Sequence, residues 1–246
     1  MNLRFLTRSA VLPLSIAILA AFAAQVASDR FTIAGMFIPQ LALAEPWRWV
    51  TSAFLHGGFY HLFFNLFALY LFGVVLENQI GSRKVLALFF GGAIAGDVGY
   101  LATGGTAPAL GASGAVYTLM GALAVLQPRL PLSFFFGPPL PLIAWVFIWA
   151  ALDVFRVFTP STIAGGAHLG GLALGLWAGF YFRRPRQPRP AAEERAIVAP
   201  RMRVKAPPRE GARFECRRCG YVATHFSEIE SPRCPGCGEP TVWRPL

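Results

Sequence analysis

The chain has 246 residues, of which 55% are hydrophobic and only 14% are charged, and its mean hydropathy is +0.50. This composition excludes an ordinary soluble domain and is typical of a polytopic, all-α membrane protein. The net charge of +10 does not point to nucleic acid, because 14 of the 22 Lys and Arg residues follow the apolar region and would form a cytoplasmic tail.

Apolar segments in chain order predict six membrane-spanning helices. The run 10–27 follows Arg4 and Arg8 and also fits a signal peptide, but its length of about 18 residues is closer to a span. The segment 29–59 is too polar to span and is rich in Trp, Phe and Leu, which favours the membrane interface. The other spans are expected at 60–76, 85–102, 113–127, 140–158 and 163–182.

Basic residues indicate the orientation of this bundle. With six spans, one side of the membrane receives only Arg30 and Arg48, whereas the other side receives Arg4, Arg8, Arg83, Lys84, Arg129 and the cluster 183–189. The positive-inside rule then places both termini in the cytoplasm. We expect the protein in the plasma (inner) membrane of a prokaryote.

Four polar side chains lie at the starts of predicted spans: His61, Asn65, Ser113 and His168. Their spans, the second, fourth and sixth, all run inward, so the four residues are expected at one depth near the outer face. A lone serine in an apolar helix more often packs or bonds to its own backbone than reacts. The convergence of the other three residues on Ser113 favours a functional interpretation.

Glycines on the fourth and sixth spans support this interpretation. Gly171, Gly175 and Gly179 follow His168 on one helix face, and Gly114 follows Ser113 directly. Small residues at such spacing allow two membrane helices to approach closely. Close packing would bring the histidine to the serine, which needs a base to take its proton before it can act as a nucleophile. The Ser113 backbone N–H and the side chains of the second span could then stabilise an oxyanion.

Several motifs together resemble those of the rhomboid family, over residues from about 10 to 182. They are Gly111–Gly114 with Tyr117 four residues after Ser113, His61 with Asn65, Ala167–Gly171 around His168, the pair Trp47–Arg48, and His56. The resemblance implies a six-helix rhomboid-like bundle and an intramembrane serine endopeptidase that needs no cofactor for catalysis.

The resemblance also implies roles for individual residues. Ser113 would be the nucleophile and His168 the general base, in a dyad without a third acid. His61 and Asn65, together with Gly111, would form the oxyanion site, and Tyr117 would support the His168 ring. Substrates would be transmembrane proteins in the lipid bilayer, cleaved near the outer membrane face.

Two other classes of function compete with this prediction. A non-catalytic membrane adaptor could bind transmembrane helices, although the retained Ser113 and His168 count against it. A metal-dependent enzyme could use histidines of the bundle, but the sequence has no HExxH pattern. The buried acids receive structural interpretations: a hydrogen bond between helices for Asp97, and a local ion pair with Arg156 for Asp153.

The four cysteines form a separate module near the C-terminus. Cys216 and Cys219, then Cys234 and Cys237, give two C-x2-C pairs that suit a tetrahedral, structural Zn²⁺ site of a zinc ribbon; iron is a minor alternative. We expect a membrane domain at 1–182, a Pro/Arg-rich linker at 183–210 and the ribbon at 211–246. The ribbon could bind a cytoplasmic protein.

Overall fold

A computed structural model of the chain describes residues 9–133, 137–159, 163–183, 214–223, 233–235, 237–239 and 243–245. The chain divides into two compact units, Met1–Arg184 and Pro185–Leu246, and each is described by itself. All but the first residue of the predicted linker lies outside the described residues. The three-part division of the chain therefore stays a prediction.

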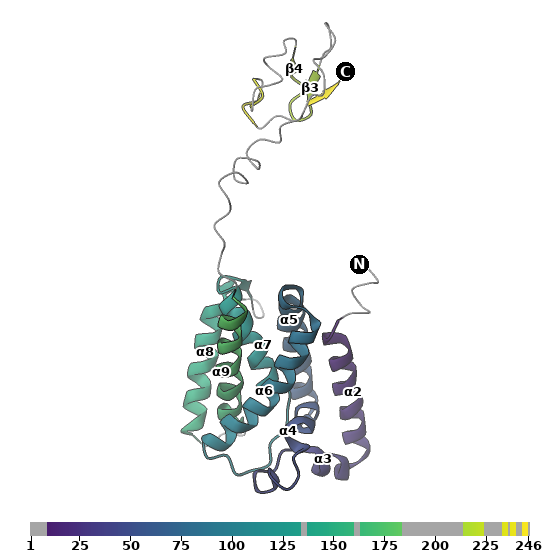
Figure 1. Ribbon diagram of the computed structural model, residues 1–246, viewed down its shortest axis with the longest axis vertical. Helices are drawn as coiled ribbons and strands as arrows, with labels where there is room; N and C mark the ends of the chain where they lie inside the picture. The colour runs from purple at the N-terminus through teal and green to yellow at the C-terminus, as the bar shows by residue number, and fades with distance from the viewer. Residues whose placement is uncertain are drawn as a thin grey trace. The chain divides into compact units, whose positions relative to one another are not determined.

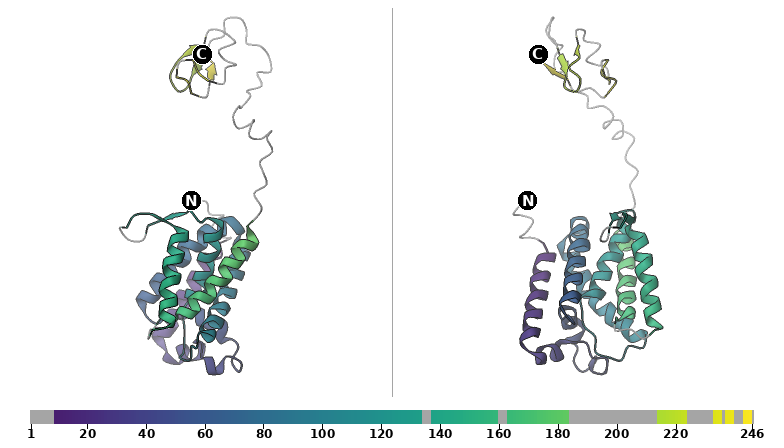
Figure 2. Two further views of the ribbon diagram at one scale, coloured as in Figure 1. Left: turned by 90° about the vertical axis from the view of Figure 1, so that its left-hand side faces the viewer. Right: turned by 180° about the vertical axis from the view of Figure 1, so that it is seen from behind.

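The first unit is a bundle of helices that stand side by side, with α2 at one edge and α8 at the other (Figures 1 and 2). A helix is found at each of the six predicted spans: α2 (Val11–Ala27), α5 (Phe59–Ile80), α6 (Ser82–Ala102), α7 (Ser113–Leu126), α8 (Leu142–Val157) and α9 (Gly165–Phe182). Short helices connect α2 to α5: α3 (Asp29–Gly35), η1 (Pro39–Leu41), α4 (Arg48–Thr51) and η2 (Ser52–Phe54).

Helix α7 is the centre of the bundle. Of its 14 residues, only Ser113, Tyr117, Val125 and Leu126 are not fully buried. At about 1.5 Å per residue it is about 21 Å long, which is shorter than the apolar core of a bilayer. The chain that precedes it must therefore descend into the bundle before the helix begins.

Glycines bring α7 and α9 into backbone contact. A Cβ added at Gly171 would overlap the Gly114 carbonyl oxygen, and one at Gly175 would overlap that of Thr118. The Thr118 hydroxyl donates a 2.7 Å hydrogen bond to the Gly171 carbonyl across this contact. The predicted close packing of the fourth and sixth spans is confirmed, and we call this contact the glycine seam.

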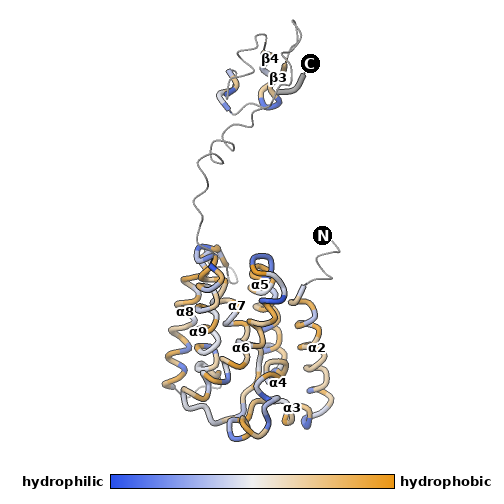
Figure 3. The backbone as a smooth tube through the Cα atoms, viewed as in Figure 1, coloured by the Kyte–Doolittle hydropathy of each residue, from blue (hydrophilic) through white to orange (hydrophobic). Residues whose placement is uncertain are grey.

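The helices of the bundle consist mainly of hydrophobic residues, coloured orange in Figure 3, and many of these residues have exposed side chains. Phe63 and Phe67 on α5 and Phe155 on α8 are among the large apolar residues with exposed side chains. Such a surface is suited to lipid. By length and composition alone, α5 and α6 could each cross a membrane, and α2 and α7 are shorter apolar helices. The number of six spans stays a prediction.

The Trp47–Arg48 pair holds the connection between α2 and α5 together. The Arg48 side chain is buried and donates 2.7 Å hydrogen bonds to the carbonyls of Ile33 and Met36, and its Nε donates to Glu45 at 2.6 Å. These contacts satisfy backbone carbonyls that the short helices leave unpaired.

Strands occur at two places. Between α7 and α8, β1 (Pro131–Leu132) and β2 (Leu140–Pro141) form an antiparallel hairpin. This hairpin was not predicted from the sequence. In the second unit, β3 (Phe214–Cys216) pairs with both β4 (Val222–Ala223) and β5 (Trp243–Pro245) in an antiparallel sheet.

Candidate active site

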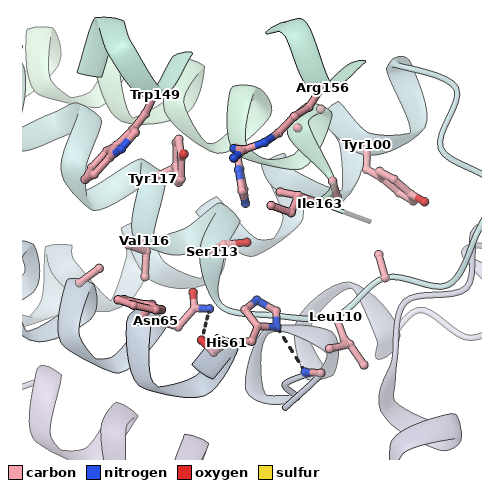
Figure 4. A pocket seen from close by; sticks show the side chains of 18 of the residues that line it. His61, Asn65, Tyr100, Leu110, Ser113, Val116, Tyr117, Trp149, Arg156 and Ile163 are labelled. Carbon is pink, nitrogen blue, oxygen red and sulfur yellow. Dashed lines mark hydrogen bonds between the residues drawn. The ribbon is translucent and has the colours of Figure 1, made fainter. Parts of the chain in front are cut away.

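Ser113 is the first residue of α7 and lies half-buried beside a cavity (Figure 4). A backbone N–H in the first turn of a helix has no partner within the helix, so the Ser113 N–H is available to a ligand. The loop before α7 is tied to the connection between α2 and α5, since Phe37 and Ala109 exchange two backbone hydrogen bonds. The loop therefore holds the start of α7 inside the bundle.

His168 lies in the first turn of α9 and is 9% exposed. Its ring stacks on Tyr117, with the ring centroids 4.3 Å apart and the planes at 13°. Tyr117 belongs to α7, one turn beyond Ser113, so the glycine seam determines this stacking as well. The aromatic contact restrains the plane of the imidazole.

His61 and Asn65 lie on α5, across the cavity from Tyr117 (Figure 4). The His61 Nδ1 accepts a hydrogen bond from the Gly57 N–H at 3.3 Å. The neutral ring therefore carries its proton on Nε2, which is then a donor. The Asn65 amide donates to the His61 carbonyl at 2.8 Å, and this bond holds Asn65 in place.

Gly111 makes room for the His61 ring. Its φ of 133° lies in the region that favours glycine,, and an added Cβ would lie 2.7 Å from the His61 Cε1. The Gly111 N–H donates to the Ser52 carbonyl at 3.0 Å. A side chain at this position would displace the histidine.

One cavity of about 1240 Å³ brings these groups together. Ser113, His168, His61, Asn65 and Tyr117 all contribute to its wall. Aromatic residues such as Trp149 on α8 and Phe64 on α5 make much of the remaining lining. The cavity is large enough for an extended peptide segment.

The contacts of two buried acids near the site, Asp97 and Asp153, agree only partly with the sequence prediction. Ser52 donates a 3.4 Å hydrogen bond to Asp97, and Asp153 pairs with Arg156 at 2.7 Å, as expected. Asp153 also approaches His168, with its Oδ2 atom 3.1 Å from the His168 Nδ1, and this contact was not predicted from the sequence. Only the ends of α8 and α9, joined by a short loop, could have suggested this proximity.

The ligand atoms of the four cysteines lie within 4.8 Å of one another: Cys216, Cys219, Cys234 and Cys237. The two sulfurs of Cys219 and Cys234 are 3.7 Å apart. A tetrahedral site with Zn–S bonds of about 2.3 Å requires about 3.8 Å between sulfurs. Backbone N–H groups of Arg218 and Cys219 donate to the Cys216 sulfur and lower the pKa of this thiol to about 7. The cluster fits a metal ion.

A protein-family comparison matches residues 43–185 to the rhomboid domain. The chain belongs to the rhomboid family. The rhomboid protease GlpG of Yersinia pestis is 36% identical over 140 residues, which are 56% of this chain and 49% of that protein. The mitochondrial RHOMBOID-like protein 12 of Arabidopsis thaliana is 33% identical over 156 residues, which are 56% of this chain and 46% of that protein.

This chain spans about half the length of these curated relatives. The rhomboid match includes α5, α6, α7, α8 and α9, and so all the residues that line the candidate site from these helices. Rhomboid proteins are membrane-embedded, and an all-α membrane bundle is what the first unit presents. The cysteine unit lies beyond the matched residues.

Proposed function

We propose that this rhomboid protein is an intramembrane serine endopeptidase with Ser113 as nucleophile and His168 as general base. The observation that carries the proposal is that both side chains line one cavity, with the His168 ring stacked on Tyr117. Relatives named rhomboid protease support the same reaction class.

The reaction follows from these groups. His168 accepts the Ser113 proton as the Ser113 oxygen attacks the scissile carbonyl carbon, and it then passes the proton to the leaving amine as the C–N bond breaks. Water, activated by the same histidine, hydrolyses the acyl-enzyme. The Ser113 N–H, the His61 Nε2–H and the Asn65 amide, with Gly111 making room for His61, stabilise the oxyanion.

The substrates we propose are transmembrane proteins cut near the outer face of a bacterial inner membrane, with both termini of the protease in the cytoplasm. The short α7 supports this site of cleavage. If the C-terminal end of α7 lies at the cytoplasmic membrane surface, a helix of 14 residues begins below the outer surface.

Cleavage of a model transmembrane substrate tests the proposal. We expect Ser113→Ala and His168→Ala each to lower kcat by about 10⁴-fold or more, and a tagged fluorophosphonate to label wild type but not Ser113→Ala. Ser15→Ala is the matched control, because the Ser15 hydroxyl on α2 donates to the Val11 carbonyl of its own helix. Undiminished cleavage by Ser113→Ala would exclude this mechanism, and absent labelling of wild type would favour a non-catalytic adaptor.

We further propose that Cys216, Cys219, Cys234 and Cys237 bind a structural Zn²⁺. The separation of the Cys219 and Cys234 sulfurs supports zinc ligation, and four thiolates leave no open position for catalysis. A zinc ribbon at 211–246 that recruits a cytoplasmic protein stays a prediction.

A further inference from the structure

Asp153 is a buried carboxylate that lies between an arginine and the proposed base. It belongs to the last part of α8 and has none of its surface exposed. Its Oδ1 accepts a 2.7 Å hydrogen bond from the Arg156 Nη1. Its other oxygen, Oδ2, lies 3.1 Å from the His168 Nδ1.

Among the described residues, the Asp153 Oδ2 and the His168 Nδ1 have no other hydrogen-bond partner. Both are inaccessible to solvent, and neither makes a hydrogen bond of good geometry to any described residue. A buried donor or acceptor without a partner is unfavourable. A small rotation of either side chain would complete a bond between them, as happens when catalytic hydrogen bonds tighten on substrate binding.

Backbone packing holds Asp153 at this distance. Gly165, at the start of α9, lies so close to α8 that an added Cβ would be 2.5 Å from the Asp153 carbonyl oxygen. His168 follows on the same helix, one turn later. The contact between Asp153 and His168 thus depends on a close crossing of two helices rather than on flexible side chains alone.

The two oxygens of Asp153 face different partners. Arg156 binds Oδ1, which leaves Oδ2 facing the His168 Nδ1. Tyr117 is a third polar side chain near this carboxylate. Figure 4 shows Arg156 reaching toward the cavity on the side of Tyr117.

We propose that Asp153 is a positioning residue that accepts a hydrogen bond from the His168 Nδ1–H. This bond leaves Nε2, the nitrogen on the side of the cavity, unprotonated and ready to accept the Ser113 proton. It also stabilises the imidazolium that forms during attack. The inference rests on the proposed function, and it adds an acid to the expected Ser–His dyad.

The proposal is tested by comparing the kcat of Asp153→Asn and Asp153→Glu with that of the wild type. Asp153→Asn keeps the shape and the Arg156 contact, but its amide N–H₂ can donate to Nδ1 and so favour the wrong tautomer. We expect the kcat of Asp153→Asn to fall at least about 100-fold, with KM nearly unchanged. The corresponding substitution in soluble serine proteases with a Ser-His-Asp triad lowers kcat by about 10⁴-fold. The loss should be smaller here because Tyr117 still orients the His168 ring. Asp153→Glu, which keeps the charge, should retain more activity than Asp153→Asn.

Asp97→Asn serves as the control. It alters a buried acid that contacts Ser52 and not His168, and its kcat should lie within about threefold of wild type. A purely structural ion pair predicts the opposite order, with Asp153→Asn close to wild type, and that result would overturn the inference. If the Ser113→Ala variant is inactive and the Asp153→Asn variant is fully active, the inference about Asp153 is refuted and the proposed function stands. If the Ser113→Ala variant is active, the proposed function itself is refuted.

A spectroscopic measurement on the wild type does not depend on the folding of any acid variant. Ring ¹⁵N-histidine spectra at alkaline pH, with the His168 signals identified by their loss in His168→Gln, report which nitrogen bears the proton. We expect the Nδ1–H tautomer for His168. An Nε2–H tautomer would overturn the inference.

Discussion

Ser113 obtains its chemical setting from backbone geometry as much as from side chains. Its free N–H comes from its place at the start of α7, and Gly111 lets the His61 ring approach. The ring of His168, the proposed base, stacks on Tyr117 with one face and faces Asp153 at its edge. Each group alone would be unremarkable in a helical protein, and their common cavity gives them a joint role.

His56 gives the resting protein a pH-dependent stability. It lies in the turn before α5, is 3% exposed, and has its pKa lowered from 6.5 to about 4 by burial and then by the nearby His61. The unfolded chain takes up this proton near pH 6.5 and the folded chain only near pH 4. The free energy of unfolding is therefore highest above pH 6.5 and falls by about 3 kcal/mol as the pH drops to 4.

The measurement compares the wild type with His56→Phe in detergent. We expect the Tm of the wild type to fall more steeply between pH 7 and pH 4.5, because the variant has no imidazole to protonate on unfolding. The difference between the two curves isolates His56 from the acids that also titrate in this range. Parallel curves would contradict the assignment.

The gathering of most candidate site residues at one cavity could be predicted because it depends on topology alone. Ser113, His168, His61 and Asn65 begin helices that run in one direction, so a correct order of spans brings them to one end. The approach of Asp153 to His168 could not be predicted, because it depends on how closely α8 and α9 pack where they cross. A periodic apolar pattern contains no information on such a distance.

At the scale of elements, the glycine seam is the contact on which the bundle depends. We expect Gly171→Ala to destabilise the protein by about 1–3 kcal/mol or more, because its Cβ would overlap the Gly114 carbonyl oxygen between two backbones,. Thermal unfolding in detergent measures the effect.

Gly91 offers a matched control on a neighbouring helix. An added Cβ there would lie 3.4 Å from the Cδ2 of Leu174, an ordinary contact with a flexible side chain. Gly91→Ala should therefore leave the Tm nearly unchanged. Equal effects of the two substitutions would show that the seam is not especially tight.

Helices were easier to predict than their connections. The apolar runs matched α2, α5, α6, α7, α8 and α9 within a few residues, because a continuous apolar run must satisfy its own backbone in a helix. The short helices between α2 and α5 depend instead on contacts of Arg48 with distant carbonyls. The β1–β2 hairpin was missed since its strands have two residues each.

At the scale of the whole molecule, the two units differ in what stabilises them. The first buries a large apolar core, whereas the described residues of the second bury mainly Cys216, Ala223 and Cys234. Such a small core is not expected to fold without help, and a bound metal would supply it.

Metal content tests this difference. Purified protein should contain about one zinc per chain, and Cys216→Ser/Cys219→Ser should lose it while the helical circular dichroism of the bundle remains. Arg218→Ala is the control from the same turn, since it removes only an exposed ion pair with Glu239. A wild type that contains iron would support the alternative metal, and one without metal would exclude the ribbon.

The glycine seam also limits how far Ser113 and His168 can separate. Backbone meets backbone along α7 and α9, and the hydrogen bond from Thr118 to the Gly171 carbonyl links the two helices at 2.7 Å. A shift of one helix along the other would break this bond and bring backbone atoms into overlap. We therefore expect the spacing of the proposed nucleophile and base to stay the same with and without a substrate in the cavity.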